Sequence, residues 1–136
     1  MANSQSIGIA YLDQDIIGAQ YIFSNEQIGY GTAAQGTVTQ LTDKGTGVTL
    51  NKSSGQITMN GAALAGNTAV TFTLTNSLIS TKDVIILNVG SVGTAGAYTT
   101  YVSSLAAGSA VLTLRNLTSG SLSEAVVINY AIIHGQ

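Results

Sequence analysis

The sequence predicts an all-β domain, a sandwich or a barrel, and two observations lead to this prediction. From residue 37 onward, short runs rich in Val, Ile, Thr, Phe and Tyr recur between clusters of Gly, Asn and Ser. Apolar residues make up 45% of the chain although charged residues make up only 7%, whereas disordered chains are poor in aliphatic residues. Because 136 residues suffice for one hydrophobic core, we expect a single folded domain with appendages.

The predicted strands follow one another along residues 37–136, and we expect about eight of them. Glycine-containing turns separate most of them, because glycine readily supplies the positive φ angles that tight turns need. In chain order the expected strands are 37–41, 47–50, 55–59, 68–75, 83–89, 97–102, 109–117 and 124–133.

Alternation along the strand at 68–75 assigns its two faces. Val70, Phe72 and Leu74 share one side, and threonines occupy the positions between them. Side chains two residues apart lie on the same face of a strand. We therefore expect this strand to be buried on one face only.

Two later strands, at 83–89 and 124–133, are apolar on both faces. This pattern is typical of a strand that lies under a second layer or against a neighbouring subunit. Central strands buried within the monomer would explain it equally well. Under the first explanation, the candidate subunit-interface residues are Ile85, Leu87, Val127 and Ala131.

Residues 1–36 differ in composition from the remainder and are expected to form an extended N-terminal arm. They contain three of the six tyrosines and three of the six acidic residues, but no Lys or Arg. The alternation at residues 7–12 has the period of a strand, and the Gly-rich residues 29–36 are expected to be a hinge or linker. The residues expected to bind a partner surface are Ile7, Ile9, Tyr11, Ile16, Ile17, Tyr21 and Phe23.

The small number of charges indicates self-association or burial in an assembly. Four basic and six acidic residues give a net charge of −2, which provides little repulsion between copies. The basic residues are scattered, so we expect no binding of nucleic acid. The N-terminus lacks the features of a signal peptide, and no apolar run is long enough to span a membrane, so we expect synthesis in the cytoplasm and no membrane partner.

The sequence offers few groups for catalysis or for metal binding. Cysteine is absent, which excludes disulfides and thiolate chemistry. His134 is the only histidine and has no evident partner for a triad or a metal site. Residues 13–18 resemble the start of a calcium loop, but Ile17 stands where the third oxygen ligand belongs and Ser24, not Glu, occupies the twelfth position. We therefore expect no enzymatic activity, no catalytic residue, no metal and no cofactor.

Charged residues at two predicted turns are expected to be solvated. Asp43 and Lys44 lie in one turn, and Lys82 and Asp83 lie in another. Charged side chains of this kind are mostly exposed. We assign them no functional role.

Residues 37–136 resemble a β-sandwich module of virion proteins from tailed bacteriophages, possibly cyanophages. The resemblance is carried by TGVTLN, GQITMN, FTLTN, DVIILNV and GSLSEAVVINYAII in this order, and SIGIAYLDQDIIG near the N-terminus is similar to the start of such proteins more loosely. It implies a jelly-roll-like sandwich and a homotrimer, and it implies no catalytic residue.

Together these observations predict a capsid decoration (cement) protein. It would trimerise on the phage head, bind the major capsid protein through its arm and stabilise the shell, so its expected location is the capsid surface of the virion. The alternative is a tail-fibre or receptor-binding tip that contacts a glycan on the host surface, for which Tyr98 and Tyr101 are candidate contacts.

Overall fold

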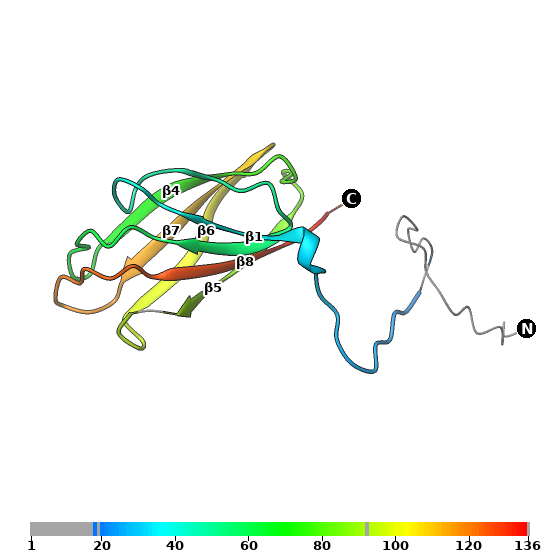
Figure 1. Cartoon of the computed structure of the whole chain (residues 1–136), viewed down its shortest axis with the longest axis horizontal. Coiled ribbons are helices and arrows are strands. Elements are labelled where there is room, and N and C mark those ends of the chain that lie inside the picture. Colours follow the sequence, from blue (N-terminus) through cyan, green and yellow to red (C-terminus); the bar gives the residue numbers. More distant parts are fainter. Residues whose placement is uncertain (1–17, 19, 92, 136) are drawn as a thin grey trace, which may run out of the picture.

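The computed structural model describes residues 18, 20–91 and 93–135, and the predicted all-β fold is confirmed. Two four-stranded sheets pack as a sandwich (Figure 1). The one helical element in this part of the chain is a 3-10 turn, η1 (Thr32–Ala34). None of the described residues form a helix long and apolar enough to cross a membrane. The strands are β1 (Gln35–Thr39), β2 (Val48–Thr49), β3 (Ser54–Thr58), β4 (Ala69–Thr75), β5 (Val84–Ser91), β6 (Tyr98–Ala106), β7 (Ser109–Asn116) and β8 (Val127–Ile133).

The first sheet has the strand order β1-β3-β8-β5, and the second has the order β2-β4-β7-β6. β1 pairs in parallel with β3 and β2 with β4, whereas all other neighbouring strands are antiparallel. Consecutive strands lie in different sheets except β6 and β7, which form a tight hairpin. Gly108 occupies this hairpin with φ of +79°, a conformation that favours glycine.

Each of the eight predicted strand ranges overlaps an observed strand, and the strand ends differ from the predicted ones by up to four residues. β1 ends at Thr39, although the Gln40 amide still donates to the backbone oxygen of Thr58. The buried Gln40 side chain donates to the backbone oxygens of Lys44 and Thr46 in the next loop. β6 is longer than predicted because a bulge at Ser103 lets the strand continue beside β7. The Ser103 hydroxyl is hydrogen-bonded there to that of Thr113.

The core lies between the two sheets. In β4, Phe72 and Leu74 are buried and the threonines between them are exposed, which confirms the predicted alternation. Leu112 of β7 pairs with Phe72 in the same sheet, and the residues across the core come from β3 and β8, including Ile57 and Ile128. Burying each such side chain contributes roughly 1.5–3 kcal/mol, which is the main term that favours folding.

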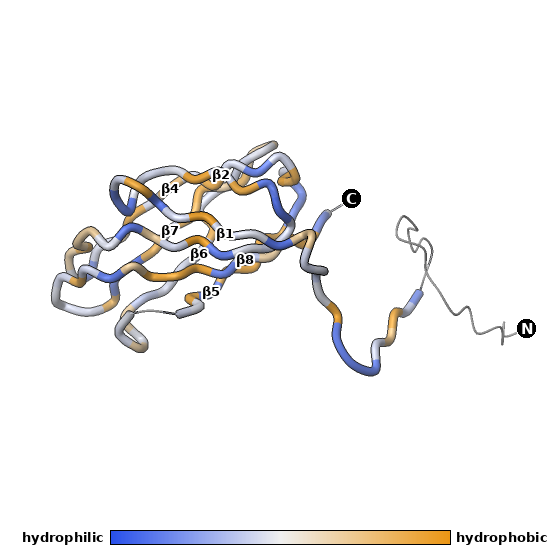
Figure 2. Tube along the Cα trace, viewed as in Figure 1, coloured by the Kyte–Doolittle hydropathy of each residue, from blue (hydrophilic) through white to orange (hydrophobic). Residues whose placement is uncertain are grey.

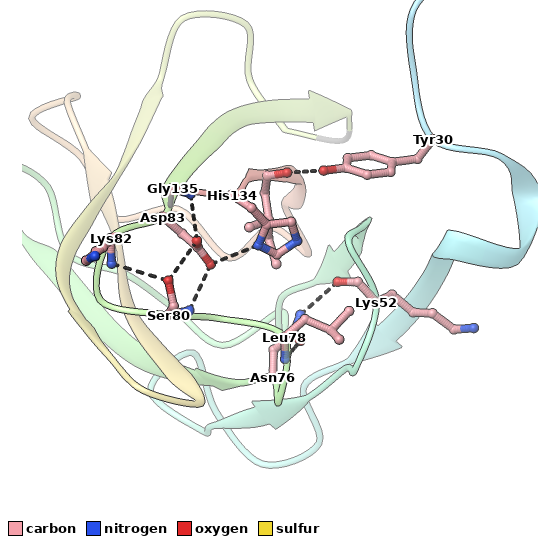
Figure 3. A network of polar contacts seen from close by, with 10 residues as sticks. Tyr30, Lys52, Asn76, Leu78, Ser80, Lys82, Asp83, His134 and Gly135 are labelled. Atoms are coloured by element: carbon pink, nitrogen blue, oxygen red, sulfur yellow. Dashed lines mark hydrogen bonds and ion pairs between the residues drawn. The ribbon is translucent and has the colours of Figure 1, made fainter. Parts of the chain in front are cut away.

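Two buried asparagines hold the loops. Asn116, at the end of β7, donates from Nδ2 to the backbone oxygens of Leu64 and Gly120, at 3.0 and 2.9 Å. Its Oδ1 accepts from the Thr118 amide at 2.9 Å. Asn76 likewise donates to the backbone oxygen of Lys52 at 2.7 Å (Figure 3). Because both residues are fully buried, their amides replace the hydrogen bonds that water would make.

Candidate assembly surface

The outer face of the first sheet is free of charged strand residues. Side chains alternate along each strand between the core and the outside. In β5, Ile85 and Leu87 pack with the core, whereas Val84 and Ile86 are exposed on the outer face. The sequences of β1, β3, β5 and β8 contain no Asp, Glu, Lys or Arg. The strands therefore present a neutral surface on this side.

One corner of this face is apolar. Val84 pairs with Ile133 and Ile86 pairs with Ala131, so their outward side chains lie next to one another across β5 and β8. The three larger side chains are 52–59% exposed. A contiguous exposed apolar patch is typical of an interaction site. We call this surface the apolar corner, and it consists of Val84, Ile86, Ala131 and Ile133.

Beside the apolar corner the outer face becomes polar but stays neutral. Asn88 stands opposite Asn129, which in turn stands opposite Gln56. Asn129 Oδ1 is buried without a hydrogen-bond partner among the described residues. An open groove of about 430 Å³ runs here, and it is lined by Gln35, Gly36, Thr37, Ser54, Gly55, Gln56, Asn129 and Tyr130. Amides and hydroxyls both donate and accept, so the groove suits a neutral polar partner.

The segment before β1 is fastened to the sandwich near the end of β8. The Tyr30 hydroxyl donates to the backbone oxygen of Ile132 (Figure 3). The Gln35 side chain donates to the backbone oxygen of Tyr30 at 2.8 Å. Lys52 Nζ donates to the backbone oxygen of Ala33, also at 2.8 Å. These three bonds fix the start of the sandwich close to the apolar corner.

Before Tyr30 the chain presents exposed apolar side chains. Tyr21 and Phe23 are 70% and 88% exposed, and their rings stack with centroids 5.9 Å apart. A polar turn at residues 24–27 follows, and Figure 2 shows apolar stretches on both sides of it. We call the exposed apolar residues of this segment the hook, and they are Tyr21, Ile22, Phe23 and Ile28.

Only part of the predicted arm lies within the described residues. Tyr21 and Phe23 are exposed members of the hook. The other predicted arm contacts lie outside the described residues, and they are Ile7, Ile9, Tyr11, Ile16 and Ile17.

The four predicted interface residues do not lie on one surface. Ile85 is a core residue and Leu87 is half-buried against the core. Val127 and Ala131 are half-buried on the outer face, beside the larger outward residues of β5 that the sequence did not single out. Because both strands are apolar at successive positions, their sequence pattern does not indicate which of the two alternating sets of side chains points outward.

A buried carboxylate joins the end of β8 to the turn before β5. The Asp83 side chain is only 1% exposed and accepts from the Ser80 amide and hydroxyl, each at 2.8 Å. It also accepts from the Gly135 amide at 3.1 Å, and His134 Nδ1 lies 3.2 Å from Oδ2 (Figure 3). The Ser80 amide is the largest of the influences that lower the pKa of Asp83 to about 2.

This cluster contains Ser, His and Asp but not the arrangement of a catalytic triad. Ser80 and His134 both approach the same carboxylate, and no hydrogen bond joins them to each other among the described contacts. A triad needs the serine hydroxyl to bond the imidazole, which then takes its proton. The geometry instead suits a structural tie of the chain end.

A second buried charge lies at the opposite end of the sandwich. Lys44 is 3% exposed, and its Nζ donates to the backbone oxygens of Asn60 and Glu124, at 2.6 and 2.5 Å. Burial lowers the pKa of Lys44, although the Glu124 carboxylate opposes this effect. Burial and the same carboxylate raise the pKa of Tyr98 to about 12. The expectation of solvated charges was therefore wrong for Lys44 and Asp83.

The remaining candidate ligand sites are only partly described. Most of the calcium-like segment at residues 13–18 lies outside the described residues. Within residues 18, 20–91 and 93–135, no three His, Asp or Glu side chains gather where they could hold a metal ion. Of the two tyrosines considered for glycan contacts, Tyr98 is buried and Tyr101 is 47% exposed.

No protein-family model, curated protein or solved structure matches this sequence.

Proposed function

We propose that this chain is a non-enzymatic structural protein that assembles through the outer face of its first sheet. The observation that supports this most is the apolar corner, which lies on a sheet face without charged strand residues. Exposure of such an apolar surface to water is unfavourable, whereas its burial against a second protein surface is favourable. The shortage of charge in the whole chain, at 7%, favours the same role.

In this proposal the protein is a homotrimeric decoration protein on the capsid surface of a tailed phage, made in the host cytoplasm. The virion location rests on the resemblance of residues 37–136. A jelly-roll-like topology is supported by the way the chain passes between sheets, because β3-β8-β5 and β4-β7-β6 are matching antiparallel sets. Residues 1–36 serve as the arm that binds the major capsid protein.

The arm would stabilise the shell by bridging subunits. Anything that binds only the assembled form adds to its stability by mass action. Exposed Tyr21 and Phe23 suit this role, because aromatic side chains bury a large area with few rotatable bonds. The fixed position of Tyr30 would transmit this attachment to the sandwich.

Two measurements test the proposal. Light scattering of the purified chain should give a trimer, and a stable monomer would contradict the assembly step. Electron microscopy should show many copies on heads incubated with the intact chain and few after deletion of residues 2–23. Equal decoration by both forms would contradict the arm mechanism, and a few copies confined to the tail would contradict the head location.

The second candidate function is a glycan-binding tip, and the neutral groove on the first sheet favours it. Gln56, Asn129 and their neighbours offer amides and hydroxyls that match sugar hydroxyl groups. The groove has no exposed aromatic face, because Tyr130 is buried beneath it. Binding on a glycan array that is lost in Gln56→Ala but kept in the Thr71→Ala control, on the second sheet, would favour this function over decoration.

A further inference from the structure

The hook and the apolar corner are two separate apolar surfaces of the same chain. The hook residues are 63–88% exposed and make no contact that buries them against the sandwich. The large residues of the apolar corner are half exposed on a sheet face. The named residues of both surfaces are uncharged, and the exposed Glu26 lies in the turn between Phe23 and Ile28. Each surface is therefore a suitable partner for the other.

We propose that the hook of one copy packs onto the apolar corner of a second copy. This inference rests on the proposed assembly function. It assigns Tyr21 and Phe23 to the contact between copies and leaves the earlier residues of the arm to bind the major capsid protein. The fastening at Tyr30 places the root of the hook at the end of the sandwich where β8 ends. From there the chain runs away from its own sandwich (Figure 1), which directs the hook to a neighbour.

The shape of the hook supports packing against a sheet face. The stacked rings of Tyr21 and Phe23 are already arranged side by side, so little conformational freedom is lost on binding. The hydrogen bonds of Ser24 stabilise a turn at residues 24–27, which separates Phe23 from Ile28. Three bulky side chains of the apolar corner would contact such an anchor from one sheet face, and aromatic anchors contribute much of the energy at most interfaces.

The symmetry of this contact follows from the two surfaces being different. A hook that binds a corner is a head-to-tail contact, because each copy gives one surface and receives the other. Such contacts close into a ring when the rotation between copies permits, and a ring of three agrees with the proposed trimer. Contact between two apolar corners would instead give a two-fold dimer.

Complementation between two variants of the full chain tests the proposal. Tyr21→Ser with Phe23→Ser removes the hook, and Ile86→Thr with Ile133→Thr removes the corner while keeping residues that favour strands. We expect each variant alone to be monomeric, with self-association weakened at least tenfold. A 1:1 mixture should form a heterodimer and stop there, because the one intact hook then meets the one intact corner.

The control is Leu41→Ser with Leu117→Ser, which alters exposed apolar residues outside both surfaces and should assemble like the wild type. The hook variant alters no core residue, so loss of its assembly cannot come from unfolding of the sandwich. Circular dichroism checks that the corner variant is folded.

Several outcomes overturn the inference. A hook variant that assembles like the wild type, while the corner variant does not, would show that the corners bind each other. Two monomeric variants that form no heterodimer would also overturn it, and both results would leave the assembly function standing. A monomeric wild type would overturn the proposed function itself. If an I86C variant is monomeric and its hook protects the thiol at position 86 from modification, the hook docks within one chain.

Discussion

Asp83 Oδ2 lies 3.2 Å from Nδ1 of His134, so the residue before β5 holds the residue after β8 although 51 positions separate them. The same carboxylate accepts from the amide of Gly135. β8 lies between β3 and β5, and its last residue, Ile133, pairs with Val84, the residue after Asp83. This contact therefore fastens a central strand at its end.

The Asp83 contact predicts a loss of stability in acid. The pKa of Asp83 is about 2 in the folded chain and near 3.8 when unfolded, so the unfolded chain binds more protons between these values. The contribution is complete above about pH 4 and is lost as the pH falls toward 2. Urea unfolding at a series of pH values should show that the free energy of unfolding falls more steeply with decreasing pH in the wild type than in Asp83→Asn. The difference in slope should correspond to up to about one bound proton. Parallel curves would contradict the role of Asp83.

The raised pKa values of two tyrosines predict how the stability changes at alkaline pH. Burial raises the pKa of both Tyr98 and Tyr130 to about 12. Because the folded chain then binds more protons than the unfolded chain between pH 10 and 12, stability should fall as the pH rises through this range. Tyrosinate absorbance should show that Tyr98 and Tyr130 ionise only near pH 12 or on unfolding. Tyr98→Phe should leave one such tyrosine, and ionisation of both near pH 10 in the folded chain would contradict the prediction.

The close packing around Gly55 predicts that a larger residue does not fit where β1 pairs with β3. A Cβ atom there would lie 2.7 Å from the backbone oxygen of Gly36 and 2.8 Å from Leu50 Cδ2. We expect Gly55→Ala to lower the free energy of unfolding by about 1–3 kcal/mol, as overpacking does. Gly61→Ala is the matched control, because no atom lies within 4 Å of its added Cβ. Equal stability of the two variants in denaturant titrations would refute the steric argument.

The Tyr30 hydroxyl predicts a local effect on the start of the sandwich. Tyr30→Phe removes the hydrogen bond to the backbone oxygen of Ile132 and should cost about 0.5–1.5 kcal/mol. Local opening would then increase about two- to tenfold, and exchange of the Ala34 amide, which bonds to Gly31, measures it. Tyr101→Phe is the control, since that hydroxyl makes no hydrogen bond among the described residues. An unchanged exchange rate in Tyr30→Phe would show that the bond is not needed.

The strands could be predicted from the sequence because their signals are local. Alternation of Phe72 and Leu74 with threonines identifies both the strand and its buried face. Glycines such as Gly108 mark turns whose backbone conformation few other residues adopt. Such features depend on residues within a few positions of one another, so they can be recognised in the sequence without knowledge of the fold.

The buried charges and the outward face could not be predicted in this way. Lys44 is satisfied by the backbone oxygen of Glu124, which lies 80 positions away, and Asp83 by residues near the C-terminus. In β5, Ile85 and Ile86 are both isoleucine, yet one is in the core and the other is half exposed. Only the packing of β5 beside β8 decides which side faces the second sheet.

The pairing of Gln35 with Ser54, and of Ser54 with Ala131, places the start of β1 and the end of β8 at one end of the sandwich. The loops that follow β3 and β7 lie at the other end, where Leu64 and Leu122 bridge them. Gly61 is exposed there with open space around it. A foreign peptide inserted after Gly61 would point away from the hook and from Tyr30. The fold is thus suited to use as a one-sided scaffold for displaying epitopes.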